Sequence, residues 1–118
     1  GVEVGDTLED LDRVAKKLIG LRIFSDGERP MERSIVDVGG ELLLVSQFTL
    51  LADTRKGNRP SYIQAARPEE AIPLYEALRD RLMVALGGRV RTGSFGADMQ
   101  VELINDGPVT ILLDSRTR

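Results

Sequence analysis

The stretch "ELLLVSQFTLLADTRKGNRPSY", residues 41–62, decides the fold and raises the question of function. It begins with the apolar run 42–45, which predicts a strand over residues 41–50 that is apolar on both faces at its start and central in a covered sheet. The run stops at Ser46-Gln47-Phe48-Thr49, and a basic loop follows. A strand that only had to reach the surface would accept any polar residues, so this set calls for an explanation.

The residues before this stretch predict a helix and a hairpin. The helix runs from residue 8 to Gly20, because apolar residues recur at helical spacing after a capping box of Thr7 and Asp10. A short strand is predicted over residues 21–24. The pair Gly39-Gly40 predicts a hairpin between strands at 34–38 and 41–50.

The residues after it predict a second helix and further strands. The helix opens at Arg67-Pro68-Glu69-Glu70, where proline and acids suit the first turn, and ends at Gly87-Gly88. Its expected buried stripe consists of Ile72, Leu74, Tyr75, Leu78, Leu82 and Ala85. Residues 89–114 alternate around turn signals and predict two or three strands. The expected fold is α+β, with two helices covering a mainly antiparallel, barrel-like sheet in one domain, residues 1–118.

The composition limits the chemistry that this chain can perform. The 118 residues are 42% hydrophobic and include no cysteine and no histidine. Disulfides, thiolate metal sites and Ser-His-Asp or Cys-His catalysis are therefore excluded, and we expect no metal and no cofactor. No apolar run approaches the ~20 residues of a membrane helix. We expect a soluble cytoplasmic protein that has no membrane partner.

The charge is distributed unevenly along the chain. The net charge of −3 argues against a protein that coats nucleic acid by charge alone, and we expect no DNA partner. A basic island nevertheless extends from residue 55 to 67 without any acid, and its members are Arg55, Lys56, Arg59 and Arg67. Such a run either binds phosphates or, more commonly, is a solvated loop.

The polar set at residues 46–49 is the first candidate for a catalytic site. Strand alternation would place Ser46 and Phe48 on one face and Gln47 and Thr49 on the other. Two hydroxyls and an amide can donate hydrogen bonds to an oxyanion or to a substrate carbonyl. On composition alone, an ordinary strand end is the commoner interpretation.

The second candidate is "NDGPVT", residues 105–110. Pro108 stands where the next strand should begin to donate hydrogen bonds, which proline cannot do. The corner is therefore an edge or a specially shaped turn, and Gly107-Pro108 is the kind of bond at which a cis peptide costs little. A plain type I or type II turn is the alternative.

Four motifs in order resemble the D-aminoacyl-tRNA deacylase family, also called the D-tyrosyl-tRNA deacylase family. They are residues 46–50 (SQFTL), 52–57 (ADTRKG), 95–101 (FGADMQV) and 105–110 (NDGPVT). The resemblance runs nearly end to end. It implies hydrolysis of the ester that joins a D-amino acid to the 3′ end of tRNA, and removal of glycine mischarged on tRNA.

The resemblance also implies roles for particular residues. Ser46, Gln47, Phe48 and Thr49 would form the catalytic pocket, with the backbone N–H groups around Phe48 as oxyanion donors. The residues Gly107, Pro108, Thr110 and Met99 would select the substrate. In the family the Gly-Pro bond is cis and enters the partner subunit's site, so the working unit is a homodimer. Arg55, Lys56 and Arg59 would hold the tRNA, and the substrate's 2′-OH would help to activate water.

One departure from the family pattern is visible. Members usually begin with two further strands, about 25–30 residues at ordinary strand and turn lengths, with an arginine expected near the terminal adenosine. This sequence starts just before the first predicted helix, so we expect it to be N-terminally truncated. Two other functions remain open: a catalytically inactive tRNA-binding module of the same fold, and an editing domain for L-aminoacyl-tRNA like that of archaeal threonyl-tRNA synthetase. The motifs 46–49 and 107–108 argue against the latter.

Overall fold

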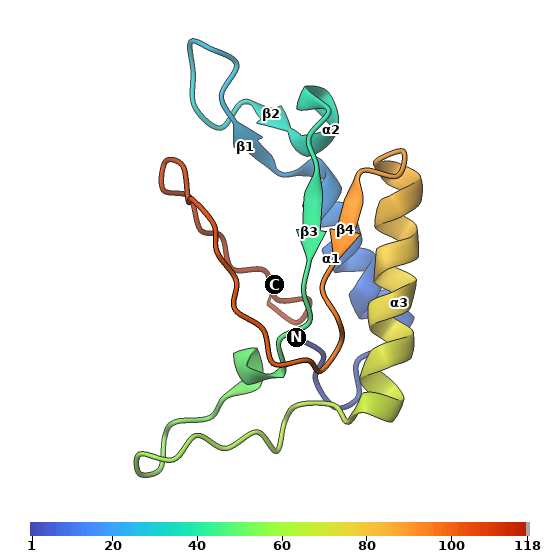
Figure 1. Cartoon of the computed structure of the whole chain (residues 1–118), viewed down its shortest axis with the longest axis vertical. Helices are drawn as coiled ribbons and strands as arrows, with labels where there is room; N and C mark the ends of the chain where they lie inside the picture. The colour runs from blue at the N-terminus through green and yellow to red at the C-terminus, as the bar shows by residue number, and fades with distance from the viewer. Residues whose placement is uncertain (118) are drawn as a thin grey trace.

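The computed structural model describes residues 1–117 and has a mixed α/β fold (Figure 1). Its elements in order are α1 (Leu8–Gly20), β1 (Arg22–Phe24), β2 (Arg33–Ser34), α2 (Ile35–Val38), β3 (Leu42–Leu44), the 3-10 helix η1 (Phe48–Leu51), α3 (Pro68–Ala85) and β4 (Val90–Thr92). Among the described residues, no helix combines the length and the apolar character that crossing a membrane requires.

Helix α3 and the strand that follows it form the core. Leu82 and Leu86 are completely buried, and they cluster with Ile35 and Val90. The helix carries the chain from β3 back to the start of β4, so the two strands run parallel, with Leu42 opposite Val90. This pairing corrects the prediction of a mainly antiparallel sheet, because the antiparallel pair in the described chain is the short β1–β2. The barrel-like closure stays a prediction.

Both long helices begin where the sequence predicts. The Thr7 backbone N–H donates to Asp10 Oδ2 at 2.9 Å, which confirms the capping box of α1. Helix α3 opens with Pro68 in its first turn, also as predicted. Ala85 is exposed, contrary to the predicted stripe, because the last buried position of this helix face falls one residue later, at Leu86.

The predicted hairpin around Gly39-Gly40 is wrong, because its first strand is largely the short helix α2. The Ser34 hydroxyl accepts from the Asp37 backbone N–H at 3.1 Å, and Asp37 Oδ2 accepts from the Ser34 N–H at 2.9 Å. Gly39 then ends the helix at a φ of 63°, in the left-handed region that suits glycine. The capping box Ser34-x-x-Asp37 therefore overrides the β-branched residues between its ends.

The two or three strands predicted for residues 89–114 reduce to β4. Residues 100–114 form an extended arm, which leaves the body, turns at its tip and returns (Figure 1). Alternating residues become a strand only when a neighbouring strand pairs with them, and within residues 1–117 none pairs with the arm. The arm consequently exposes a set of large apolar side chains: Val101, Leu103, Ile104, Ile111, Leu112 and Leu113.

We predict that Leu82→Ala lowers the free energy of unfolding by about 2–5 kcal/mol, because it opens a cavity at the centre of the core. Val84→Ala, on the same helix but with Val84 85% exposed, is the control and should stay within about 0.5 kcal/mol of the parent. Urea denaturation followed by circular dichroism measures both values. Equal losses in the two variants would contradict the assignment of the core.

Candidate functional site

The polar set Ser46-Gln47-Phe48-Thr49 lies where the chain leaves β3. The strand ends at Leu44, and Phe48 and Thr49 already belong to η1, so the predicted strand alternation over residues 46–49 is wrong. The Gln47 side-chain amide donates to the Thr49 hydroxyl, which holds these two side chains together. Ser46 and Thr49 are half-buried, whereas Gln47 and Phe48 are exposed. The set therefore forms a compact polar turn at the end of the β3–β4 pair.

Hydrogen bonds and packing determine where that turn begins. The Tyr75 hydroxyl of α3 donates to the Leu44 carbonyl at 3.1 Å, and its ring packs edge-to-face on Phe95 at 5.7 Å. The same carbonyl accepts from the Gly93 N–H at 3.2 Å. Tyr75 was predicted only as part of a buried stripe, so sequence reasoning missed its polar contact with the end of β3.

Met99 is the predicted selection residue that the fold brings closest to the polar set. Its sulfur lies over Gly93, so close that a Cβ at that glycine would stand 3.2 Å from it. Val45, the residue before Ser46, packs on the same glycine. The space that a side chain at residue 93 would fill is thus occupied by Met99, next to the point where the polar turn begins.

The other predicted selection residues lie at the tip of the arm. Gly107 and Pro108 are exposed, and the bond between them is cis, which confirms that expectation. Asn105, which sequence reasoning did not single out, closes the tip: its Oδ1 accepts from the Val109 N–H at 2.9 Å, and its amide donates to the Thr110 hydroxyl at 3.2 Å. An asparagine that binds nearby backbone is a recognised turn signal, and it was available in the sequence.

The structure does not bring the arm tip to the polar set of the same chain. Figure 1 shows the tip and η1 well apart, at different heights of the molecule. Two halves of the predicted site, residues 46–49 with Met99 and residues 105–110, are therefore separate surfaces in one copy.

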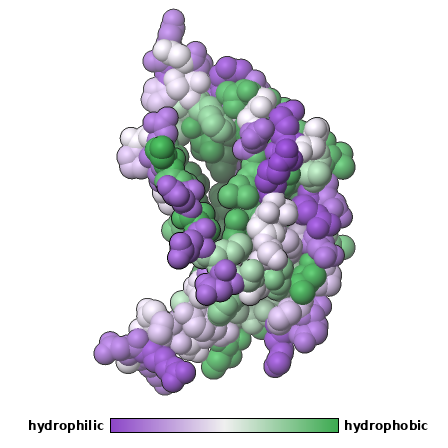
Figure 2. Space-filling model, in the orientation of Figure 1, coloured by the Kyte–Doolittle hydropathy of each residue, from purple (hydrophilic) through white to green (hydrophobic). Residues whose placement is uncertain are grey.

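The basic residues project on a finger, residues 53–61. Its base is closed by two backbone hydrogen bonds between Asp53 and Ser61, at 2.8 and 2.9 Å. Arg55 folds back onto Asp53, with Nη2 to Oδ2 at 2.6 Å, and Lys56 and Arg59 are exposed. Figure 2 shows the finger as the hydrophilic projection at the lower left. The predicted basic island is thus largely a protruding positive loop.

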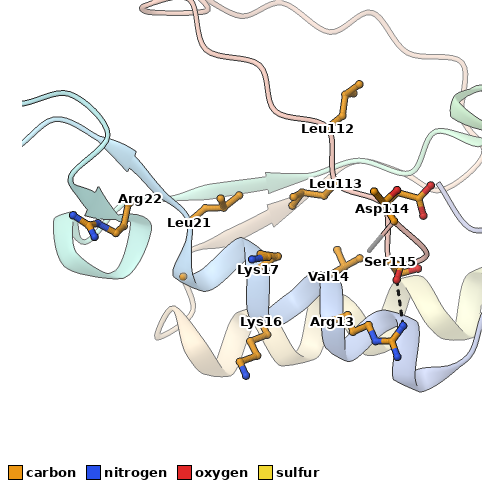
Figure 3. Close-up of a pocket in the computed structure, with 12 residues that line it drawn as sticks. Arg13, Val14, Lys16, Lys17, Leu21, Arg22, Leu112, Leu113, Asp114 and Ser115 are labelled. Carbon is orange, nitrogen blue, oxygen red and sulfur yellow. Dashed lines mark hydrogen bonds between the residues drawn. The ribbon is translucent and has the colours of Figure 1, made fainter.

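Two grooves of the described residues lie near α1 and near η1. One, of about 730 Å³, lies between α1 and residues 112–117, and is lined by apolar and basic side chains (Figure 3). Across it the Arg13 guanidinium donates to the Ser115 carbonyl at 3.3 Å. None of the predicted site residues lines this groove. A second, shallow groove of about 400 Å³ lies between η1 and the base of the finger, and Arg55 is part of its wall.

The side chains of the site offer hydrogen-bond donors but no ready base. Thr49 and Thr110 each receive a hydrogen bond from a side-chain amide, which cannot accept a proton at neutral pH. Among residues 1–117, no group of three His, Cys, Asp or Glu side chains is arranged to hold a metal ion. The arrangement suits positioning and oxyanion stabilisation rather than attack by a protein nucleophile.

We predict a pKa of about 2 for Asp53, lowered chiefly by its hydrogen bonds to the Arg55 side chain. Since the folded value lies below the ordinary value of about 3.9, this carboxylate stabilises the fold above about pH 4, and the contribution is lost as the pH falls through about 2. Arg55→Gln should raise the pKa of Asp53 in an NMR titration, but not all the way to its ordinary value, because the backbone N–H of residue 55 still donates to Asp53 Oδ1. Asp26, whose pKa is lowered by the backbone N–H groups of Arg29 and Glu28, is the internal control and should not move. An unchanged Asp53 would contradict the pairing.

Comparison with known proteins places these features in a family. Residues 1–114 match the family model described as D-Tyr-tRNA(Tyr) deacylase. A solved structure, the c-Myc DNA Unwinding Element Binding Protein, superposes with a TM-score of 0.92 at 36% identity, over 99% of this chain and 79% of that chain.

Curated relatives are similar over the entire sequence. The D-aminoacyl-tRNA deacylase of Akkermansia muciniphila is 60% identical, and that of Parabacteroides distasonis is 53% identical. Each match covers 100% of this chain and 79% of the relative. The chain therefore belongs to the D-Tyr-tRNA(Tyr) deacylase family.

Proposed function

We propose that this chain, as one domain, hydrolyses the ester bond between a D-amino acid and the 3′ end of tRNA, and releases both. Family membership over residues 1–114 supports the reaction, as do relatives named D-aminoacyl-tRNA deacylase at 53–60% identity. The structural observation that carries the proposal is the polar turn at residues 46–49, anchored to the end of β3 and built of donors without a base.

In the proposed mechanism water attacks the ester, and the protein positions the substrate. Ser46, Gln47 and the first backbone N–H groups of η1, around Phe48, stabilise the oxyanion that forms on the ester carbonyl. Those N–H groups have no partner within the helix, as at any helix start. The substrate's own 2′-OH lies beside the ester and helps to activate the water. Water rather than a threonine is the nucleophile in this proposal, because the hydroxyls of Thr49 and Thr110 are hydrogen-bonded to side-chain amides, which cannot take up their protons.

In the same proposal, selection comes from a second copy of the chain. The tip residues Gly107 and Pro108 are exposed and lie apart from the polar turn of their own chain, and the arm that carries them exposes many apolar side chains. A homodimer in which each tip enters the other copy's site, beside Met99, would cover this arm and complete both sites. Backbone carbonyls at the tip then leave no room for an L side chain, so that rejection supplies the specificity. Glycine, which has no side chain, would also be hydrolysed.

The finger supplies the proposed contact with tRNA. Arg55, Lys56 and Arg59 project from a chain whose net charge is −3, so the positive charge is local. Such a loop can neutralise acceptor-stem phosphates, and this contact makes binding salt-dependent. Because the proposed substrate, aminoacyl-tRNA, occurs in the cytosol, we propose that the protein is cytoplasmic.

We predict that the chain hydrolyses D-Tyr-tRNA at least about a hundredfold faster than L-Tyr-tRNA, because one face of the site excludes the L side chain. The rates are measured with a chelator present, against the uncatalysed loss of each substrate. Chelation should leave the rate unchanged. Equal rates for the two enantiomers would contradict the proposal, and absence of hydrolysis together with retained tRNA binding would favour the inactive binding module.

A further inference from the structure

An exposed aromatic pair lies at the root of the finger. The rings of Phe48 and Tyr62 meet edge-to-face, with centroids 5.1 Å apart and planes at 75°. Phe48 is 57% exposed and Tyr62 is 37% exposed, whereas both rings of the other aromatic pair, Tyr75 and Phe95, are half-buried. An edge-to-face contact occupies at most one face of one ring, so flat aromatic surface remains available for stacking.

The finger places this pair beside positive charge. Tyr62 directly follows Ser61, whose backbone bonds to Asp53 close the base of the finger, and Phe48 opens η1 on the other side of that base. Arg55, Lys56 and Arg59 all lie between the two rings in sequence and are exposed, against one acid, Asp53. The finger thus carries exposed aromatic surface at its base and cations from the base outward.

Resting on the proposed function, we propose that Tyr62, supported by Phe48, is a stacking platform for a nucleobase of the single-stranded 3′ end of the tRNA. Proteins that hold single-stranded nucleic acid combine a positive groove for the backbone with aromatic side chains for the bases. Here the cations of the finger hold phosphates while the ring of Tyr62 holds a base. Tyr62 is a positioning residue: it fixes the terminal nucleotides and so directs the ester toward residues 46–49.

Position and charge favour a base over other occupants. Phe48 immediately follows Ser46-Gln47 in the polar turn, so a nucleotide stacked at this pair lies next to the proposed reaction centre. The free amino acid offers no phosphate for the finger to bind. A three-nucleotide single strand with an aminoacylated end offers phosphates, bases and the ester in the order in which the finger, the aromatic pair and the polar turn occur.

Binding of a short RNA tests the stacking directly and does not depend on hydrolysis. The probe is a single-stranded RNA of sequence CCA whose terminal adenine is replaced by the fluorescent 2-aminopurine, which is quenched when it stacks. Tyr62→Ala and Tyr62→Leu should each weaken binding about tenfold, since base stacking on an aromatic ring contributes at about this level. Tyr62→Phe keeps the ring and should bind like the parent. The matched control is Ile63→Ala, an adjacent apolar residue that is 82% exposed, and it should also bind like the parent.

A second RNA, abasic at its terminal nucleotide, separates stacking from charge. It should bind the parent and Tyr62→Leu equally. On D-Tyr-tRNA the Tyr62 variants should raise KM about tenfold and leave kcat nearly unchanged, as expected of a positioning residue. Equal binding of CCA by the parent and by Tyr62→Leu, or an equal loss with the abasic RNA, would overturn the inference. If the parent quenches the probe but does not hydrolyse D-Tyr-tRNA, the stacking stands and the proposed function fails.

Discussion

The burial of Leu82 and Leu86 against Val90 and Ile35 is the constraint on which the rest of the structure depends. It holds α3 against the sheet, so that the chain returns from β3 to β4 as a parallel crossover. The same helix presents Tyr75, whose hydroxyl binds the Leu44 carbonyl at the end of β3. Helix α3 therefore determines where the polar turn starts, although none of its residues belongs to the turn.

The sequence predicts best where its signals are local. The capping box of Thr7 and Asp10, the opening of α3 at Pro68 and the turn at Asn105–Thr110 each depend on residues a few positions apart. It fails where two local signals compete, as at Ser34–Val38, where capping outweighs β-branched residues. It also fails where a long-range partner decides, as in the arm, which alternates like a strand but has no pairing neighbour among residues 1–117.

The site shows the same division. Residues 46–49 and 107–108 stand out in the sequence as a polar strand end and an unusual Gly-Pro corner, and the family resemblance implies their roles, but their relative placement is not a local property. Neither the 3-10 turn that begins at Phe48 nor the separation of the arm tip from it follows from spacing. In the proposed function, residues 46–49 stabilise the oxyanion and the arm tip excludes L side chains. Activation of water is left to the substrate, which suits a chain without histidine or cysteine.

The most direct test of this account is complementation between two inactive variants. Phe48→Pro removes a backbone N–H of the polar turn. Gly107→Val adds bulk at the arm tip, where the φ is 134° and a Cβ would lie 2.9 Å from Val109. The distorted tip should then block the other copy's site to either enantiomer, and so abolish activity on D-Tyr-tRNA as well. If the site joins the turn of one copy to the tip of another, mixing equal amounts of the two variants with subunit exchange should restore about a quarter of the parent rate on D-Tyr-tRNA. Half of the dimers are then mixed, and one of the two sites in each mixed dimer is intact. A mixture as inactive as its components, despite exchange shown by differential labelling, would contradict the account.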